Sequence, residues 1–99
     1  MERVASVLSR VIRQLGLEKE MLGWKITEEW ADLVGPRISR HTRCVGFHDG
    51  TLRVEVGGAA WMHELRFLER ELVRKANCHL GSDVVRDVRF VVPRGGSLR

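Results

Sequence analysis

Histidine and cysteine side chains gather in one short stretch of the chain. His41, Cys44 and His48 fall within residues 41–48, and Cys78-His79 follows later. Imidazole nitrogens and thiolates are the ligands that zinc prefers. In an extended strand, however, Cys44 and His48 would share a face about 13 Å apart, too far for one metal ion. No Cys-x-x-Cys pair accompanies them. We therefore expect no metal site and no cofactor.

The other residue patterns that support catalysis are absent or weak. A nucleophilic Cys–His pair needs a third group to orient it, and none is evident. The sequence contains no P-loop, no GxGxxG motif and no nucleophile elbow. Paired acids such as Glu28-Glu29 and Glu69/Glu71 lie on polar faces of expected helices. We therefore expect no enzymatic activity. The alternative of a metal- or thiol-dependent enzyme is supported only by the cluster His41/Cys44/His48.

A glycine pair, Gly57-Gly58, precedes the longest amphipathic segment. The free amides and dipole of a helix N-terminus can hold a phosphate. The alternative is that these glycines only let the chain turn sharply from a strand into a helix. Since no Lys or Ser accompanies the pair, we favour the turn.

Arginine dominates the charge of the chain. Seventeen Lys and Arg residues face thirteen Asp and Glu, a net charge of +4, and fourteen of the seventeen are arginine. The guanidinium fork binds phosphate or carboxylate through two hydrogen bonds at once. Residues 33–48 and 88–99 contain basic but no acidic side chains. This asymmetry favours an anionic partner such as nucleic acid, although a basic surface can also be merely solvated.

Hydrophobic periodicity predicts the secondary structure around one turn. Asp49-Gly50 separates two alternating runs, which is a strong hairpin signal because Gly accepts positive φ. In residues 51–56 the apolar side chains alternate with Arg53 and Glu55, so one face of this strand is expected to be buried. After Val56 the apolar period changes from 2 to 3.6, which predicts a helix.

The same signals predict a single α+β domain. We expect helices at 2–15, 18–34 and 59–80, with a short turn after Pro36, and strands at 42–48, 51–56 and 84–92. In strand 42–48, Val45 and Phe47 are expected on one side and Cys44 on the other. The order α-α-β-β-α-β predicts a three-stranded sheet covered on one face by helices. Ninety-nine residues suit one domain, which we expect to span 1–93 with a short flexible tail at 94–99.

The three tryptophans occupy different positions on the expected helices. Trp30 and Trp61 fall on core stripes, so we expect packing to account for both. Trp24 lies off the stripe of the helix at 18–34, and we expect it to bridge to the first helix.

The outer side of the helix expected at 59–80 carries a regular basic row. Its members recur every four residues, flanked by His63 and Asn77: Arg66, Arg70 and Arg74. Phe67 lies beside the row and off the core stripe. An exposed aromatic next to arginines favours a contact with a partner. Glu64 and Glu71 flank the row. The alternative is that pairs within the helix, such as Arg66–Glu69 and Arg70–Glu69, neutralise it.

Composition limits where the protein works. The hydrophobic fraction of 43% suits a globular domain, and no apolar run approaches the ~18 residues of a membrane span. The N-terminal charges at helical spacing do not form a signal peptide. Two cysteines are too few for a disulfide scaffold. We expect a cytoplasmic protein without a membrane partner.

Taken together, the motifs of the chain resemble the DciA family of bacterial proteins that serve the replicative helicase. The resemblance runs from about Trp24 to Val92 and rests on these motifs in this order: Trp30-x-x-x-Val34-Gly35-Pro36-Arg37-Ile38, His41-Thr42-Arg43, Asp49-Gly50-Thr51-Leu52-x-Val54-x-Val56, Ala60-Trp61-x-x-Glu64-Leu65 and Val88-x-Phe90.

The resemblance implies a KH-like fold and a non-catalytic adaptor that recruits or loads the hexameric helicase on DNA, single-stranded or forked. The Gly-x-x-Gly clamp of RNA-binding KH domains is absent. Many members of the family carry a long basic extension that this sequence lacks, so we expect weak DNA binding from the folded surface. The alternative is a KH-like DNA- or RNA-binding protein without a helicase role.

These expectations assign residues to two surfaces. If DNA is bound, the phosphate contacts are expected from Arg37, Arg40, Arg43, Arg53 and Arg89. The contact with the helicase is expected on the outer face of the helix at 59–80, from Arg66, Phe67, Arg70 and Arg74.

Overall fold

The computed structural model describes residues 3–93, so the tail expected at 94–99 lies outside the described residues. Four helices and three strands follow one another in this order: α1 (Val4–Gln14), α2 (Glu18–Ser39), β1 (Thr42–His48), β2 (Thr51–Val56), α3 (Ala59–Phe67), α4 (Glu69–Leu80) and β3 (Asp87–Val91). Among residues 3–93, no helix is both long enough and apolar enough to cross a bilayer.

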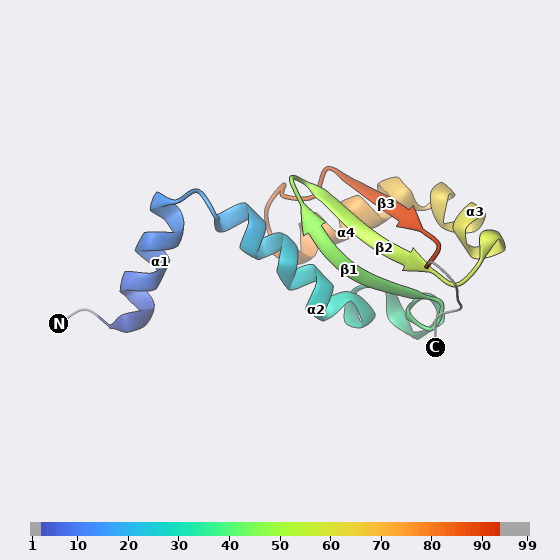
Figure 1. Cartoon of the computed structure of the whole chain (residues 1–99), viewed down its shortest axis with the longest axis horizontal. Coiled ribbons are helices and arrows are strands. Elements are labelled where there is room, and N and C mark those ends of the chain that lie inside the picture. Colours follow the sequence, from blue (N-terminus) through green and yellow to red (C-terminus); the bar gives the residue numbers. More distant parts are fainter. Residues whose placement is uncertain (1–2, 94–99) are drawn as a thin grey trace.

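The three strands form one mixed sheet in the order β1-β2-β3. β1 and β2 are antiparallel and joined by the turn Asp49-Gly50, whose φ angles of 49° and 85° are both positive. Such a turn matches the twist of a hairpin. β3 lies parallel to β2, which requires the crossover through α3 and α4. In Figure 1, α4 lies behind the sheet, α2 runs below it and α3 lies at its right-hand end. The predicted α+β architecture is confirmed.

A β-bulge in β1 changes which side chains face the core. The pairing with β2 shifts between Cys44 and Gly46, so Val45 is an extra residue. Both Cys44 and Phe47 are therefore buried, at 7% and 4% exposure. The prediction that they lie on opposite sides was wrong, because a bulge breaks the period-2 alternation on which it relied.

The helix expected at 59–80 is two helices. The chain bends at Leu68, where φ is −96° and ψ is 2°, between α3 and α4. The bend lets Leu65 of α3 and Leu72 of α4, at 0% and 4% exposure, reach the same core. A straight helix would direct its stripe along a single line. The prediction of one continuous helix was therefore wrong.

The predicted break after Val34 and the short turn after Pro36 are confirmed, because α2 is kinked at Gly35 (φ 86°) and Pro36 starts a last helical turn that runs to Ser39. One other boundary differs from the prediction. β3 begins at Asp87 instead of residue 84. The preceding segment does not pair with the sheet, because the Asn77 side chain binds its backbone: Oδ1 accepts from the amides of Val84 and Val85 at 3.0 and 2.8 Å, and Nδ2 donates to the Val85 carbonyl at 2.9 Å.

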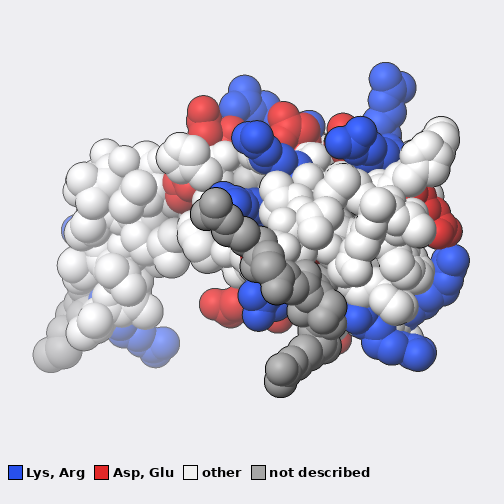
Figure 2. Space-filling view, turned by 45° about the vertical axis from the view of Figure 1, so that its right-hand side comes forward, with Lys and Arg blue, Asp and Glu red and all other residues white. Residues whose placement is uncertain are grey.

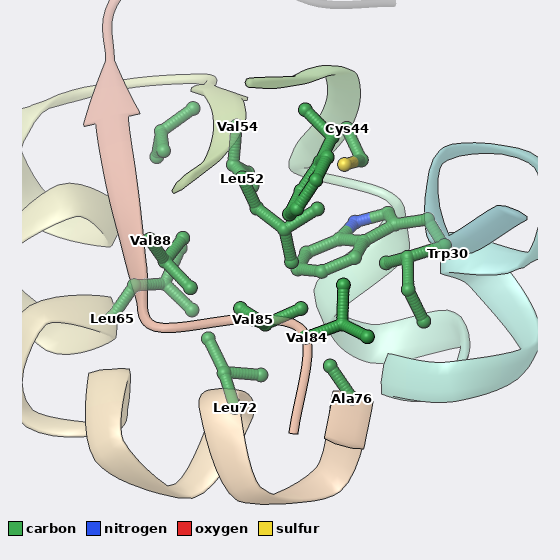
Figure 3. Close-up of a cluster of buried hydrophobic side chains, with 13 residues drawn as sticks. Trp30, Cys44, Leu52, Val54, Leu65, Leu72, Ala76, Val84, Val85 and Val88 are labelled. Atoms are coloured by element: carbon green, nitrogen blue, oxygen red, sulfur yellow. The ribbon is translucent and has the colours of Figure 1, made fainter. Parts of the chain in front are cut away.

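The core lies between the sheet and the helices α2, α3 and α4. Figure 3 shows Trp30 of α2 among side chains from the sheet and from α4. Its indole Nε1 donates to Thr42 Oγ1 at 2.9 Å, and that hydroxyl donates to the Ile38 carbonyl at 2.8 Å. The buried polar atoms are thereby satisfied. The predicted core position of Trp30 is confirmed, whereas Trp61 is half-buried at the edge of the core.

α2 approaches β1 closely at Gly23. A Cβ atom at this position would overlap the ring of Phe47. The missing side chain lets the helix backbone lie against the ring, and it brings the next residue, Trp24, to the outer edge of β1. One carbon of the Trp24 indole lies 3.8 Å from where a Cβ of Gly46 would be.

α1 projects from the body of the protein. Figure 1 shows it at one end, away from the sheet, and the molecule measures 54 × 26 × 23 Å along its principal axes. None of its residues is buried. The predicted apolar stripe is present but exposed, including Leu8 at 57% and Leu15, just past its end, at 66%.

Candidate nucleic-acid and partner interfaces

Three of the five arginines expected at nucleic acid lie on the open face of the sheet, opposite the helices. Arg43 on β1 is paired across the strands with Glu55 on β2, and its Nη2 lies 2.9 Å from Glu55 Oε1. Arg53 on β2 and Arg89 on β3 are register partners of one another. Within residues 3–93 neither of these two guanidinium groups forms an ion pair or hydrogen bond. Arg53 and Arg89 are thus two adjacent positive charges without a partner among the described residues.

Arg37 lies elsewhere, at the end of α2. Its Nη2 is 3.2 Å from Glu64 Oε1, and its guanidinium carbon is 5.5 Å from the ring centre of Trp61. The ring of His41 stacks on Trp61 at 4.4 Å between centroids. These contacts join the end of α2 to α3. Arg40 follows as the exposed residue that ends α2. The five arginines therefore do not form one patch, and the structure brings together only those of the sheet.

The expected partner surface lies on the outer side of α3 and α4. Phe67 is 80% exposed, and its ring meets that of His63 edge-on at 5.3 Å. The expectation that Phe67 faces solvent is therefore confirmed. Arg66, Arg70 and Arg74 are exposed as well, and Arg74 lies 3.8 Å from Glu71.

The bend at Leu68 divides the basic row between two helices. Arg66 belongs to α3, whereas Arg70 and Arg74 belong to α4 and border a shallow hollow of about 560 Å³. Asn77 does not extend the row, because its side chain binds the backbone of the segment before β3. The prediction of a continuous row that ends in Asn77 was wrong.

Sequence reasoning missed the residues around the hairpin end of the open face. A hollow of about 710 Å³ there is lined in part by Trp24, His48, Arg53, Arg86 and Arg89. The sequence favoured Trp24 only as a bridge to the first helix, yet it is 49% exposed over β1. The signal available in the sequence was its position off the core stripe of α2 and directly after a glycine.

The His/Cys cluster of the sequence is dispersed in the fold. His41 stacks on Trp61, Cys44 lies in the core and His48 is exposed on the open face. Burial raises the pKa of the Cys44 thiol to about 11, which keeps it protonated at neutral pH. Among the described residues, no three His, Cys, Asp or Glu side chains are grouped so that they could hold a metal ion.

Charge is distributed in separate groups over the surface. In Figure 2 the Lys and Arg side chains form several clusters with Asp and Glu among them, around a broad area without charged residues. On this face the basic side chains therefore form small groups instead of one continuous basic patch.

Comparison with known proteins supplies the family. The family model described as "Dna[CI] antecedent, DciA" matches residues 3–90. The chain belongs to the DciA family. The resemblance of the motifs to this family is thereby confirmed.

Relatives of this DciA-family chain occur in several actinobacteria. It is 30% identical over 98 residues to a UPF0232 protein of Corynebacterium glutamicum, covering 99% of this chain and 55% of that protein. It is 29% identical to a UPF0232 protein of Mycobacterium tuberculosis, with 93% of this chain and 51% of that protein covered. A UPF0232 protein of Rhodococcus jostii is 26% identical over 94 residues, covering 95% of this chain and 50% of that protein. The chain thus spans about half the length of the curated relatives it matches.

Proposed function

We propose that this protein is a non-catalytic adaptor that recruits or loads the hexameric replicative DNA helicase and binds nucleic acid weakly. The observation that carries the proposal is the match to the DciA family over residues 3–90. An adaptor of this kind acts through binding energy alone, so it needs surfaces for two partners and no reactive group. Its place of action would be the bacterial cytoplasm, at single-stranded or forked DNA.

For the helicase we assign the surface formed by Arg66, Phe67, Arg70 and Arg74. An exposed aromatic ring flanked by arginines is the composition that dominates binding energy at protein interfaces. Phe67 is 80% exposed, so its burial by a partner removes a large apolar area from water. Arg66 and Arg70, on either side of the bend, would add charge complementarity to an acidic surface of the helicase.

For nucleic acid we assign Arg37, Arg40, Arg43, Arg53 and Arg89. Arg53 and Arg89 support this best, because within residues 3–93 they have no acidic partner. Arg37 and Arg43 would have to exchange Glu64 and Glu55 for phosphate, and both pairs are at the surface, where such pairs contribute little. Changing Arg37, Arg40 and Arg43 to Ala together should therefore weaken DNA binding less than removing Arg53 and Arg89.

The helicase surface is tested by titrating the protein against immobilised replicative helicase of its own host. We expect Phe67→Ala to weaken binding at least tenfold and to leave the melting temperature nearly unchanged, because the ring is outside the core. Val92→Ala is the matched control, since Val92 is also exposed, at 51%, but lies after β3. Equal binding by Phe67→Ala and the unmodified protein would exclude this surface.

The unpaired arginines of the sheet also favour a second function, a KH-like nucleic-acid-binding protein without a helicase role. The two functions differ in one observable. The adaptor forms a discrete complex with the helicase, whereas the second function requires nucleic-acid binding with no helicase complex.

A further inference from the structure

The hollow at the hairpin end of the open face combines three guanidinium groups with an indole. It measures about 710 Å³ and is bordered by Trp24, Gly46, His48, Arg53, Arg86 and Arg89. Trp24 comes from α2 and reaches the edge of β1, where one carbon of its indole lies 3.8 Å from the position of a Cβ on Gly46. The arginines come from β2, β3 and the segment before β3. Separate parts of the chain therefore meet at one concave site.

The charges of this hollow do not balance internally. Arg86 donates to the Asp49 carbonyl at 2.7 Å and lies 3.6 Å from the Asp49 carboxylate. Arg53 and Arg89, in contrast, are direct neighbours across β2 and β3 and have no ion pair or hydrogen bond within residues 3–93. Two positive charges side by side on neighbouring strands repel one another. An anion between the two guanidinium groups would relieve this repulsion.

The exposed indole of Trp24 indicates which kind of anion would bind in the hollow. Trp24 is 49% exposed although it is one of only three tryptophans in the chain. Proteins that bind single strands combine an arginine-lined groove for the backbone with aromatic side chains on which bases stack. A duplex cannot offer the face of a base, because its bases already stack on one another. A carboxylate or free phosphate would use the arginines but not the indole.

We propose that this hollow binds single-stranded nucleic acid, with a base stacked on Trp24 and a backbone phosphate between Arg53 and Arg89. The proposal rests on the proposed function, since it gives the nucleic-acid binding of the adaptor a defined site. His48 and Arg86 border the same site and add hydrogen-bond donors at its rim. Stacking accepts any base, so the site would bind strands without strong sequence preference.

The test is fluorescence anisotropy of a labelled 20-mer of thymidine with the full chain, over a series of salt concentrations. Removal of a stacking side chain corresponds to a roughly 5- to 150-fold change in affinity. We expect Trp24→Ala to weaken binding within that range without changing the salt dependence. We expect Arg53→Gln with Arg89→Gln to weaken binding and to reduce the slope of log K against log salt by about 0.7 for each phosphate that is no longer neutralised.

Two matched controls lie on α4 and α1, away from the hollow. Lys75→Gln removes an exposed charge, and Leu8→Ala removes an exposed apolar side chain. Both should leave the affinity for the strand unchanged. Equal weakening by Lys75→Gln and the double arginine variant would overturn the proposal, because the binding would then depend on total charge.

Stacking has a signature of its own. Binding of the 20-mer should quench part of the tryptophan fluorescence of the protein, and Trp24→Phe should lose that quenching while keeping most of the affinity. Retained quenching in Trp24→Phe would overturn the stacking assignment. A duplex of the same length that binds as tightly as the single strand would also overturn it. A 20-mer of uridine, measured beside the thymidine strand, shows whether the hollow binds RNA as well as DNA. Both strands offer base faces for stacking and phosphates for the arginines.

These experiments distinguish a failure of the adaptor role from a failure of the strand-binding site. If the helicase does not bind but the strand does, and Trp24→Ala weakens it, the adaptor role is wrong and this site stands. If the helicase binds both the unmodified protein and Trp24→Ala while the strand affinity does not depend on Trp24, this site is wrong and the adaptor role stands.

Discussion

At the scale of single residues, the two cysteines have opposite environments. Cys44 is 7% exposed in the core, whereas Cys78 is exposed on α4. The bulge in β1 is what turns Cys44 inward and separates it from His48. A thiol in that position is a packing group.

Thiol labelling at pH 8 should therefore distinguish the two cysteines. Because burial raises the pKa of Cys44 to about 11, only about 0.1% of it is thiolate at pH 8. We expect Cys78 to react with a disulfide reagent within minutes and Cys44 only after denaturation. Equal rates for both thiols in the native protein would contradict the buried position of Cys44.

The same shift has a consequence for stability. The folded pKa lies above the ordinary value of 9.0, so the unfolded chain loses this proton first as the pH rises. The contribution of the Cys44 thiol to the free energy of unfolding is therefore full below about pH 9. It should be lost as the pH rises from about 9 to 11.

At the scale of elements, one side chain decides how the chain enters β3. Asn77 of α4 makes three hydrogen bonds to the backbone of Val84 and Val85, which are 4% and 3% exposed. The segment thus leaves α4 in a fixed direction, and the amides of Arg86 and Asp87 then donate to the Gly50 carbonyl, at 2.7 and 3.2 Å, where β3 begins to pair with β2. The neighbourhood of Arg53 and Arg89 depends on that pairing.

Asn77→Ala should therefore lower the free energy of unfolding by about 2 to 4 kcal/mol, because the amide and the carbonyl of Val85 would be left without a partner. The Val84 amide would keep its bond to the Ser82 carbonyl, at 3.0 Å. Urea denaturation followed by circular dichroism measures the change. Lys75→Ala on the exposed side of α4 is the control and should change stability by less than about 0.5 kcal/mol. A similar small change for Asn77→Ala would show that water replaces the side chain without cost.

The elements also show what a sequence can and cannot predict. The turn Asp49-Gly50 and the inward row of β2 were predictable, because positive φ and period-2 alternation are local properties. The bulge at Val45 and the bend at Leu68 were not, because they arise from packing against other elements. For the same reason the sequence indicated Arg53 and Arg89 separately, but their adjacency depends on the parallel pairing of β2 with β3. Trp24 was missed because its position over β1 depends on how α2 packs against the sheet.

At the scale of the whole molecule, α1 stands apart from a single core. Its apolar residues are exposed, and none of them is buried against the sheet or the other helices. The helices α2, α3 and α4 already cover the inner face of the sheet, so the body does not depend on α1 for its core (Figure 1).

Changing Leu8 and Leu15 to Gln together should therefore lower the melting temperature by less than about 3 °C, because neither side chain leaves a buried site. Leu65→Ala is the matched comparison, since Leu65 is fully buried, and should cost about 2 to 5 kcal/mol. Thermal unfolding followed by circular dichroism gives both values. A decrease from the Gln variant as large as that from Leu65→Ala would mean that α1 is covered in solution.

The central claim is that this DciA-family chain binds the replicative helicase. Size-exclusion chromatography with light scattering, on a mixture with the helicase of its own host, tests it most directly. We expect a discrete complex heavier than the helicase hexamer that persists at about 200 mM salt, since screening at that strength dissolves purely electrostatic contacts. Separate elution of the two proteins at every salt concentration, with single-stranded DNA still bound by the chain, would contradict the adaptor role.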